Sequence, residues 1–76
     1  MRLPQVSGRD CVRALGRAGF VVRRQRSTHI TLTRNEPFAQ VTVPDHHHVD
    51  RGTLREIIRQ AGMTVEEFTN LVRGDR

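Results

Sequence analysis

The chain is short, strongly basic and poor in aromatic residues. Its 76 residues carry 13 basic side chains, all of them arginine, against 8 acidic ones, for a formal net charge of +5. This length suits a single domain over residues 1–76, with no room for a second folding unit. The longest wholly apolar run, residues 20–22, is far shorter than the roughly 20 residues of a membrane span. The N-terminus lacks the apolar segment of a signal peptide and a single cysteine cannot form an internal disulfide, so we expect a cytoplasmic protein.

The excess of arginine has two interpretations. A guanidinium group is always charged, and its planar fork of donors matches a phosphate, which favours a polyanionic partner such as a nucleic acid. An ordinary solvated surface has the same composition. Composition does not separate the two, so the positions of the arginines have to decide.

Residues 8–18 are predicted to form the first helix. Ser7 is a good N-cap, apolar residues recur behind it on one helical face, and Gly19 is placed to end the helix. Cys11 lies at the edge of that face, so we expect a small buried side chain rather than a nucleophile.

A hairpin is predicted next, because apolar and polar residues alternate with a period of two on both sides of a short loop. A three-residue loop, Arg26 to Thr28, keeps the apolar residues of both strands on one face, whereas a two-residue loop would put them on opposite faces. The register that follows pairs Gln25 with His29, Arg23 with Thr31, and Val22 with Leu32.

A third strand follows a turn at residues 34–37, because residues 39–43 alternate again and end at Pro44. The sheet is then antiparallel, with one polar face. The residues expected on that face are His29, Thr31, Gln40 and Thr42.

Two helices complete the chain. Thr53 and Glu56 form a capping box for the first of them, with Asp50 as an alternative cap, and Thr64 and Glu67 form a capping box for the second. The predicted order is αβββαα, which belongs to the α+β class.

Arginines also gather on the first of these two helices. Arg51, Arg55 and Arg59 recur every four residues, roughly at right angles to the apolar face. They form either a solvated face or a ridge that follows phosphates, and their place beside a loop favours the ridge.

The run from His46 to His48 suggests a metal site, because imidazole binds zinc, nickel and copper. Structural zinc sites, however, pair ligands across roughly two to five residues and add a second cluster, which this chain lacks. We therefore expect no metal and no cofactor. The chain also has no tryptophan or tyrosine, and Phe20 and Phe68 fit core positions, so a platform that stacks single-stranded bases is not expected.

His29 likewise has two interpretations. A lone histidine on a half-exposed strand is often a solvated bystander. Beside arginines, however, an imidazole can exchange a proton near neutral pH while guanidinium groups hold a phosphate and offset charge in the transition state. Cleavage of RNA by its own 2′-hydroxyl needs little more than this, and needs no metal.

Four short motifs occur in a recognisable order. They are an AGF turn, an RQ-x3-H stretch, a VTVP strand end and a GTLR-x-I-x-RQAG helix, within SGRDCVRALGRAGFVVRRQRSTHITLTR and VTVPDHHHVDRGTLREIIRQAGMTVEEF. Together they resemble the HicA family of toxin-antitoxin mRNA interferases, from about Leu3 to Leu71.

The resemblance implies a fold similar to the double-stranded RNA-binding domain, with helices on one face of a three-stranded sheet. It also implies metal-independent cleavage of mRNA, and an antitoxin, HicB, that covers the site. The family's catalytic histidine follows a Gly-Ser or Gly-Thr pair, and His29 occupies that position here. Ser27 stands where the family usually has glycine, so a turn that used glycine's positive φ would have to be built otherwise.

Two hypotheses about function follow. In the first, the protein is a ribonuclease toxin in which His29 is the general base or acid. Three arginines contact phosphate, namely Arg23, Arg24 and Arg26, and two extend the groove, namely Arg51 and Arg55. The second proton-transfer group is left open among His47, His48, a water molecule and the substrate. In the second hypothesis, the same basic face binds RNA or DNA without cleaving it.

Overall fold

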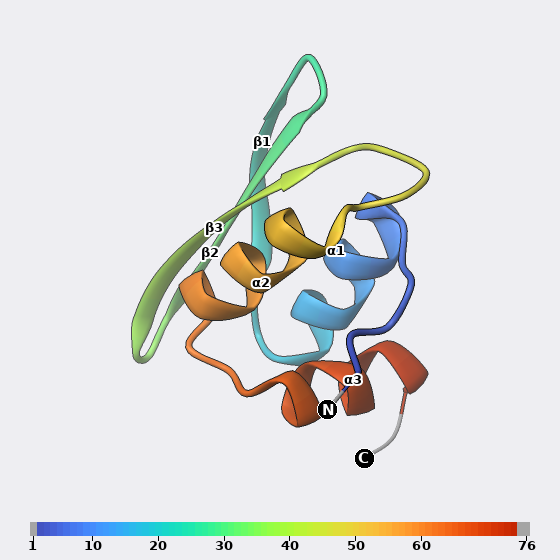
Figure 1. Ribbon diagram of the computed structural model, residues 1–76. Helices are drawn as coiled ribbons and strands as arrows, with labels where there is room; N and C mark the ends of the chain where they lie inside the picture. The colour runs from blue at the N-terminus through green and yellow to red at the C-terminus, as the bar shows by residue number, and fades with distance from the viewer. Residues whose placement is uncertain (1, 75–76) are drawn as a thin grey trace.

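The computed structural model describes residues 2–74 and has the predicted order of elements. These elements are α1 (Gly8–Arg17), β1 (Val21–Arg26), β2 (His29–Asn35), β3 (Phe38–Pro44), α2 (Arg51–Gln60) and α3 (Val65–Arg73). The strands form one antiparallel sheet in the order β1-β2-β3, and the helices lie on one side of it (Figure 1). The α+β class and the layout with helices on one face are therefore confirmed. Within the described part of the chain, no helix is long and apolar enough to span a membrane.

Local capping signals start the helices. Ser7 and Asp10 form a reciprocal capping box for α1, and Thr64 and Glu67 form the predicted one for α3. Helix α2 begins at Arg51, three residues before the start that a Thr53 cap would give, because the carboxylate of Asp50 accepts a hydrogen bond from the backbone N–H of Thr53 at 2.8 Å. The alternative cap, Asp50, is thus the one used, since a carboxylate is favoured at the positive end of a helix.

The hairpin between β1 and β2 differs from the prediction. Its loop has two residues, because Arg26 pairs directly with His29, and Gln25 pairs with Ile30 rather than with His29. A β-bulge at Arg23 supplies the extra residue that brings Val22 opposite Leu32, as predicted. The bulge therefore does what the longer loop was expected to do, since one inserted residue moves all later side chains to the other face.

Strands β2 and β3 pair without a bulge, from His29 opposite Pro44 to Asn35 opposite Phe38. The connecting turn is shorter than predicted, because Asn35 still belongs to β2 and only residues 36–37 lie between the strands. Helix α2 lies against β3, and the backbone N–H of Thr42 donates to Oε1 of Gln60 at 3.2 Å.

The core lies between the sheet and the helices. Phe20 and Phe68, predicted for the core, are 4% and 0% exposed. The other buried hydrophobic residues are Val6, Cys11, Ala14, Leu15, Ile30, Leu32, Val41, Val43, Val49, Leu54, Ile57, Ile58 and Ala61.

Strand β1 lies at the open edge of the sheet. All six of its residues are exposed, and Val22 is 46% exposed although its partner Leu32 is fully buried. The expectation that Val22 is buried was therefore wrong. The reason is its place on the edge strand, because β1 has a neighbouring strand on one side only, whereas Leu32 lies on the central strand β2. Figure 1 shows β1 at this edge and the tip of the β1–β2 hairpin extending past the helices.

Candidate active site

A tight turn places His29 at the first position of β2. Ser27 is the first of the two loop residues and has a φ of 56°, the only positive φ of a non-glycine residue within residues 2–74. A positive φ at the first position of a two-residue hairpin loop is a backbone conformation that glycine normally supplies. The expectation that serine would force a different turn was therefore wrong, because Ser27 itself adopts the left-handed backbone.

Three arginines share the sheet face of His29. Directly opposed residues point to the same face, and so do alternate residues of one strand. Arg26 is opposite His29 and Arg24 is opposite Thr31, which places both arginines on that face. Nε of Arg23 donates to Oγ1 of Thr33 at 2.8 Å. Thr33 lies on the same face of β2 as Thr31 and His29, because it follows them by two and four residues. The side chain of the bulged Arg23 therefore reaches this face as well.

Within residues 2–74, no acidic side chain neutralises the charge of these arginines. The ion pairs among residues 2–74 join Arg9 to Asp45, Arg13 to Asp10, and Arg59 to Glu56, and none involves Arg23, Arg24 or Arg26. All three side chains are exposed. They therefore remain available to an anionic ligand.

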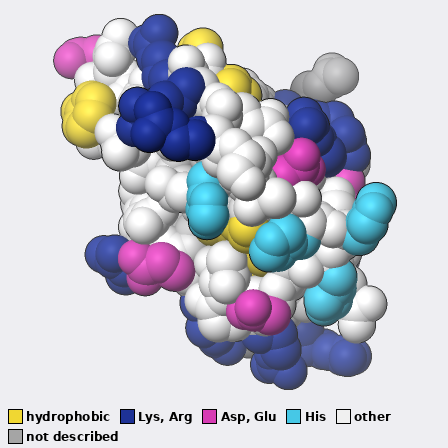
Figure 2. Space-filling view, turned by 90° about the horizontal axis from the view of Figure 1, so that it is seen from above, with side chains coloured by type: hydrophobic (Ala, Val, Ile, Leu, Met, Phe, Trp, Pro, Cys, Tyr) yellow, Lys and Arg dark blue, Asp and Glu magenta, His cyan; other side chains and the backbone are white. Residues whose placement is uncertain are grey.

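His29 lines an open cleft of about 340 Å³ between the sheet and the start of α2. The volume lies in the range of small-molecule sites, roughly 300–1,000 Å³. The cleft is lined by His29, Thr42, Pro44, His46, Val49, Asp50 and Thr53. Figure 2 shows histidine side chains gathered over one face of the molecule, with arginines at its margins.

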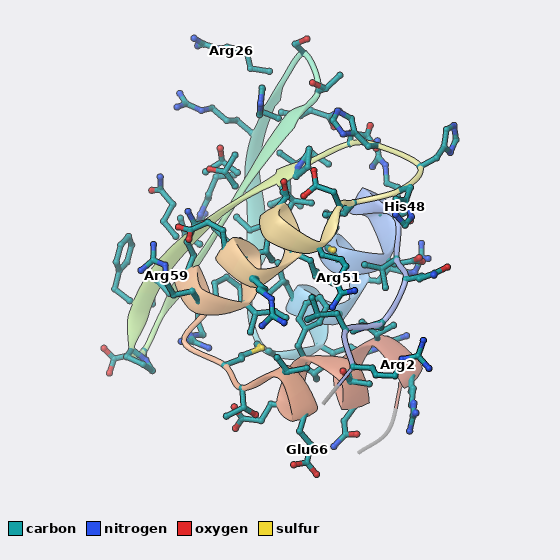
Figure 3. All side chains as sticks on the ribbon, viewed as in Figure 1. Arg2, Arg26, His48, Arg51, Arg59 and Glu66 are labelled. Atoms are coloured by element: carbon teal, nitrogen blue, oxygen red, sulfur yellow. The ribbon has the colours of Figure 1, made fainter. Side chains whose placement is uncertain are left out.

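The arginines of α2 lie elsewhere. Thr53 faces the cleft of His29, whereas Arg51 lines a separate cavity of about 150 Å³ together with Arg2 and His48. Arg55, one turn after Arg51, shares its side of the helix. In Figure 3, Arg26 stands at the end of the hairpin and Arg51 lies over the helices. The structure thus puts Arg23, Arg24 and Arg26 on the sheet face of His29, whereas Arg51 lines another cavity. None of these arginines is among the residues that line the cleft of His29.

Comparison with known proteins places the chain in a family. A family model described as the HicA toxin of bacterial toxin-antitoxin systems matches residues 8–63, which is most of the chain. The chain belongs to the HicA toxin family. A search of curated proteins found no match. The matched region contains α1, the whole sheet and α2, and therefore the cleft of His29.

Membership of the HicA family makes the protein a toxin of a toxin-antitoxin system, and such a toxin has an antitoxin partner. The backbone at position 27 gives a physical reason for the glycine that the resemblance led us to expect two residues before His29. The turn requires a left-handed backbone at position 27, which glycine adopts without steric cost and serine does not.

The histidine run is divided between different surroundings. All three histidines are exposed, but His46 lines the cleft of His29, His48 lines the cavity of Arg51, and His47 lines neither. Across residues 2–74, no three histidine, cysteine or carboxylate side chains are placed to hold a metal ion together.

Burial removes Cys11 from consideration as a nucleophile. Its side chain is fully buried, as predicted, and burial raises the pKa of the thiol to about 12, with a smaller contribution from the negative charge of Asp10. A thiolate is the reactive form, so this cysteine is inert near neutral pH.

The sequence analysis did not single out His46 as a residue of the cleft. It considered His47 and His48 for proton transfer but not the first histidine of the run. The signal was present in the register, because Pro44 is opposite His29 and the chain then passes the end of β2. If the predicted pairing of β2 with β3 is continued as far as His29, the residues after Pro44 are expected to lie beside the hairpin loop.

Proposed function

We propose that this toxin is a metal-independent ribonuclease that cleaves mRNA. The observation that carries the proposal is that His29 is exposed in a cleft and shares its sheet face with three arginines that have no acidic partner in residues 2–74. Proton transfer and charge stabilisation are the two contributions that cleavage by a 2′-hydroxyl requires.

The arrangement supports a mechanism within the RNA itself. The 2′-oxygen attacks the adjacent phosphorus, and His29 acts as the general base or the general acid of this displacement. Arg24 and Arg26 hold the non-bridging oxygens and stabilise the negative charge that builds up on them. Because the nucleophile belongs to the substrate, the mechanism requires no metal-bound water.

Backbone contacts dominate this proposed interaction. Two of the three phenylalanines, Phe20 and Phe68, are buried in the core. Phe38 is 68% exposed but opposes Asn35 at the other end of β2 from His29. No phenylalanine is therefore among the described residues that line the cleft, and we expect contacts to phosphate and sugar to dominate.

We propose further that a HicB-like antitoxin covers the cleft. A protein that blocks it has to match three unpaired guanidinium groups on one face, so carboxylates at its contact surface are expected. Masking His29 and the arginines together would stop both binding and cleavage.

The proposal is tested with purified toxin and an mRNA substrate in excess EDTA. Cleavage should persist and leave a 2′,3′-cyclic phosphate and a 5′-hydroxyl. His29→Ala should abolish cleavage and relieve growth arrest, whereas Arg59→Ala, on the outer side of α2, should retain both. A His29→Ala variant as toxic as the parent would show that another group carries the reaction.

The alternative is a module that binds nucleic acid without cutting it, and the three arginines are compatible with it. In the His29→Ala background, Arg26→Ala should reduce the salt dependence of RNA binding, lowering the slope of log K against log salt by about 0.7, whereas Arg59→Ala removes the same charge without this effect. Salt-sensitive binding by the parent with no cleavage products would favour the alternative.

A further inference from the structure

The cleft of His29 contains a second histidine from a distant part of the chain. His29 comes from β2, and His46 comes from the connection between β3 and α2, yet both line the same cleft. Thr42 and Pro44 lie on the strand between them and Val49, which is 3% exposed, adds an apolar surface. A substrate phosphate that binds in this cleft would therefore meet a surface that both histidines line.

The backbone around His46 is fixed to the hairpin that carries His29. The N–H of Asp45 donates to the carbonyl oxygen of Thr28, immediately before His29, at 2.6 Å. On its other side, the carbonyl oxygen of His46 accepts from the N–H of Gly8, at the start of α1, at 2.8 Å. Backbone hydrogen bonds thus connect the two segments that carry His29 and His46, although these segments are far apart in the sequence.

Asp45 also connects these segments through its side chain. Its carboxylate accepts from Nε and Nη2 of Arg9 at 3.2 and 3.0 Å, and from Nε2 of Gln25 at 3.2 Å. Gln25 lies on β1, opposite Ile30. Asp45 therefore connects α1, β1 and the hairpin loop, and its contacts fix the backbone next to His46.

Gly8 makes the close approach possible. A Cβ at this position would lie 2.0 Å from the carbonyl oxygen of Pro44, which no side chain tolerates. The absence of a side chain lets the first turn of α1 contact residues 44–46 directly, and this contact fixes the backbone that carries His46.

Asp50, the other titratable residue that lines the cleft, is already engaged. Its carboxylate accepts from the backbone N–H of Thr53 to cap α2, and this hydrogen bond lowers the pKa of Asp50. It therefore stays ionised near neutral pH and does not donate a proton. His46 is the lining residue, besides His29, whose side chain type exchanges protons in that range.

We propose that His46 is the second catalytic residue of the cleft and forms an acid-base pair with His29. This inference rests on the proposed ribonuclease function and names the group that completes it. One neutral imidazole takes the proton of the 2′-hydroxyl as the bond from O2′ to phosphorus forms. The other, protonated, gives its proton to the 5′-oxygen as the bond from phosphorus to O5′ breaks. The products are a 2′,3′-cyclic phosphate and a 5′-hydroxyl, and the two histidines have exchanged protonation states.

The test compares His46→Ala with His47→Ala, which changes the neighbouring exposed histidine. His46→Ala should lower the rate of cleavage about 10²–10⁴-fold, the usual contribution of a general acid or base, and remove one limb of the bell-shaped profile of kcat/KM against pH. His47→Ala should keep the rate and both limbs. Circular dichroism and Tm show whether each variant is folded, and His46→Gln serves if alanine disturbs the loop.

A modified substrate separates catalysis from a structural role. A 5′-bridging sulfur makes a leaving group that needs no proton, so it restores cleavage only in the variant that lacks the acid. Recovery by His46→Ala assigns the acid to His46. Recovery by His29→Ala assigns the acid to His29, and an impaired His46→Ala that the sulfur does not restore then assigns the base to His46. Failure of both to recover, or near-parental activity of folded His46→Ala while His29→Ala is inactive, overturns the pairing but leaves the ribonuclease proposal standing. If the parent toxin cuts no RNA, both fall.

Discussion

The turn before His29 makes a sharp prediction about stability. Ser27 has a φ of 56°, in the left-handed region that disfavours every residue with a Cβ. Its partner in the loop, Thr28, has no positive φ. Ser27→Gly should therefore stabilise the protein, whereas a glycine at most other positions of a hairpin destabilises it.

The magnitude follows from two opposing contributions. A left-handed backbone costs a residue other than glycine about 1–2 kcal/mol. Part of this gain is lost, because glycine increases the conformational freedom of the unfolded chain and so lowers stability by about 0.4–1 kcal/mol. The net gain for Ser27→Gly is about 0.5–1 kcal/mol, and for a domain of this size that raises Tm by about 2–8 °C.

Thermal unfolding followed by circular dichroism measures the effect, with Thr28→Gly as the matched control. The control adds the same freedom to the unfolded chain without relieving a left-handed residue, so its Tm should fall by about 2–8 °C. Because Ser27→Gly keeps the backbone conformation that places His29, its cleavage rate should be at least that of the parent. A Tm for Ser27→Gly at or below the parental value would refute the turn geometry.

Two further predictions concern the helix that carries Cys11. Gly8→Ala should lower stability by about 1–3 kcal/mol through overpacking against the backbone of Pro44. Gly16→Ala has open space around it and should raise stability by about 0.5–1 kcal/mol. Urea unfolding measures both changes, and equal effects would contradict the close contact at Gly8. The raised pKa of Cys11 predicts that stability falls as pH rises from about 9 toward 12, because the unfolded thiol ionises in this range and the folded one does not. A Cys11→Ala variant should lose this part of the pH dependence of Tm, and a parent whose native thiol alkylates rapidly at pH 9 would show that the residue is not buried.

Much of the fold could be predicted because its signals are local. A cap acts within one turn of a helix, so Ser7 and Thr64 marked the starts of α1 and α3 correctly. The bulge at Arg23 could not be predicted in this way. A loop of two residues with a bulge and a loop of three without one give the same pairing of Val22 with Leu32, and nothing in the alternation of side chains separates them.

The candidate site divides along the same line. His29 and the arginines of β1 lie close together in the sequence, so strand alternation and family resemblance were enough to group them. Arg51 and Arg55 were grouped with them by their position after the loop, but the rotation of α2 about its own axis turns the side of Arg51 toward another cavity. That rotation depends on which apolar residues α2 buries against the sheet, which is a property of packing.

The sequence alone determined the order of the elements, the family and the histidine on which the proposed activity rests, because periodicity, caps and short motifs are encoded within a few residues. Only the tertiary structure decided what surrounds that histidine. The placement of His46 depends on contacts that Gly8, Thr28 and Asp45 make across three separate elements. No local pattern encodes such contacts, since they form only when the helices and the sheet pack together.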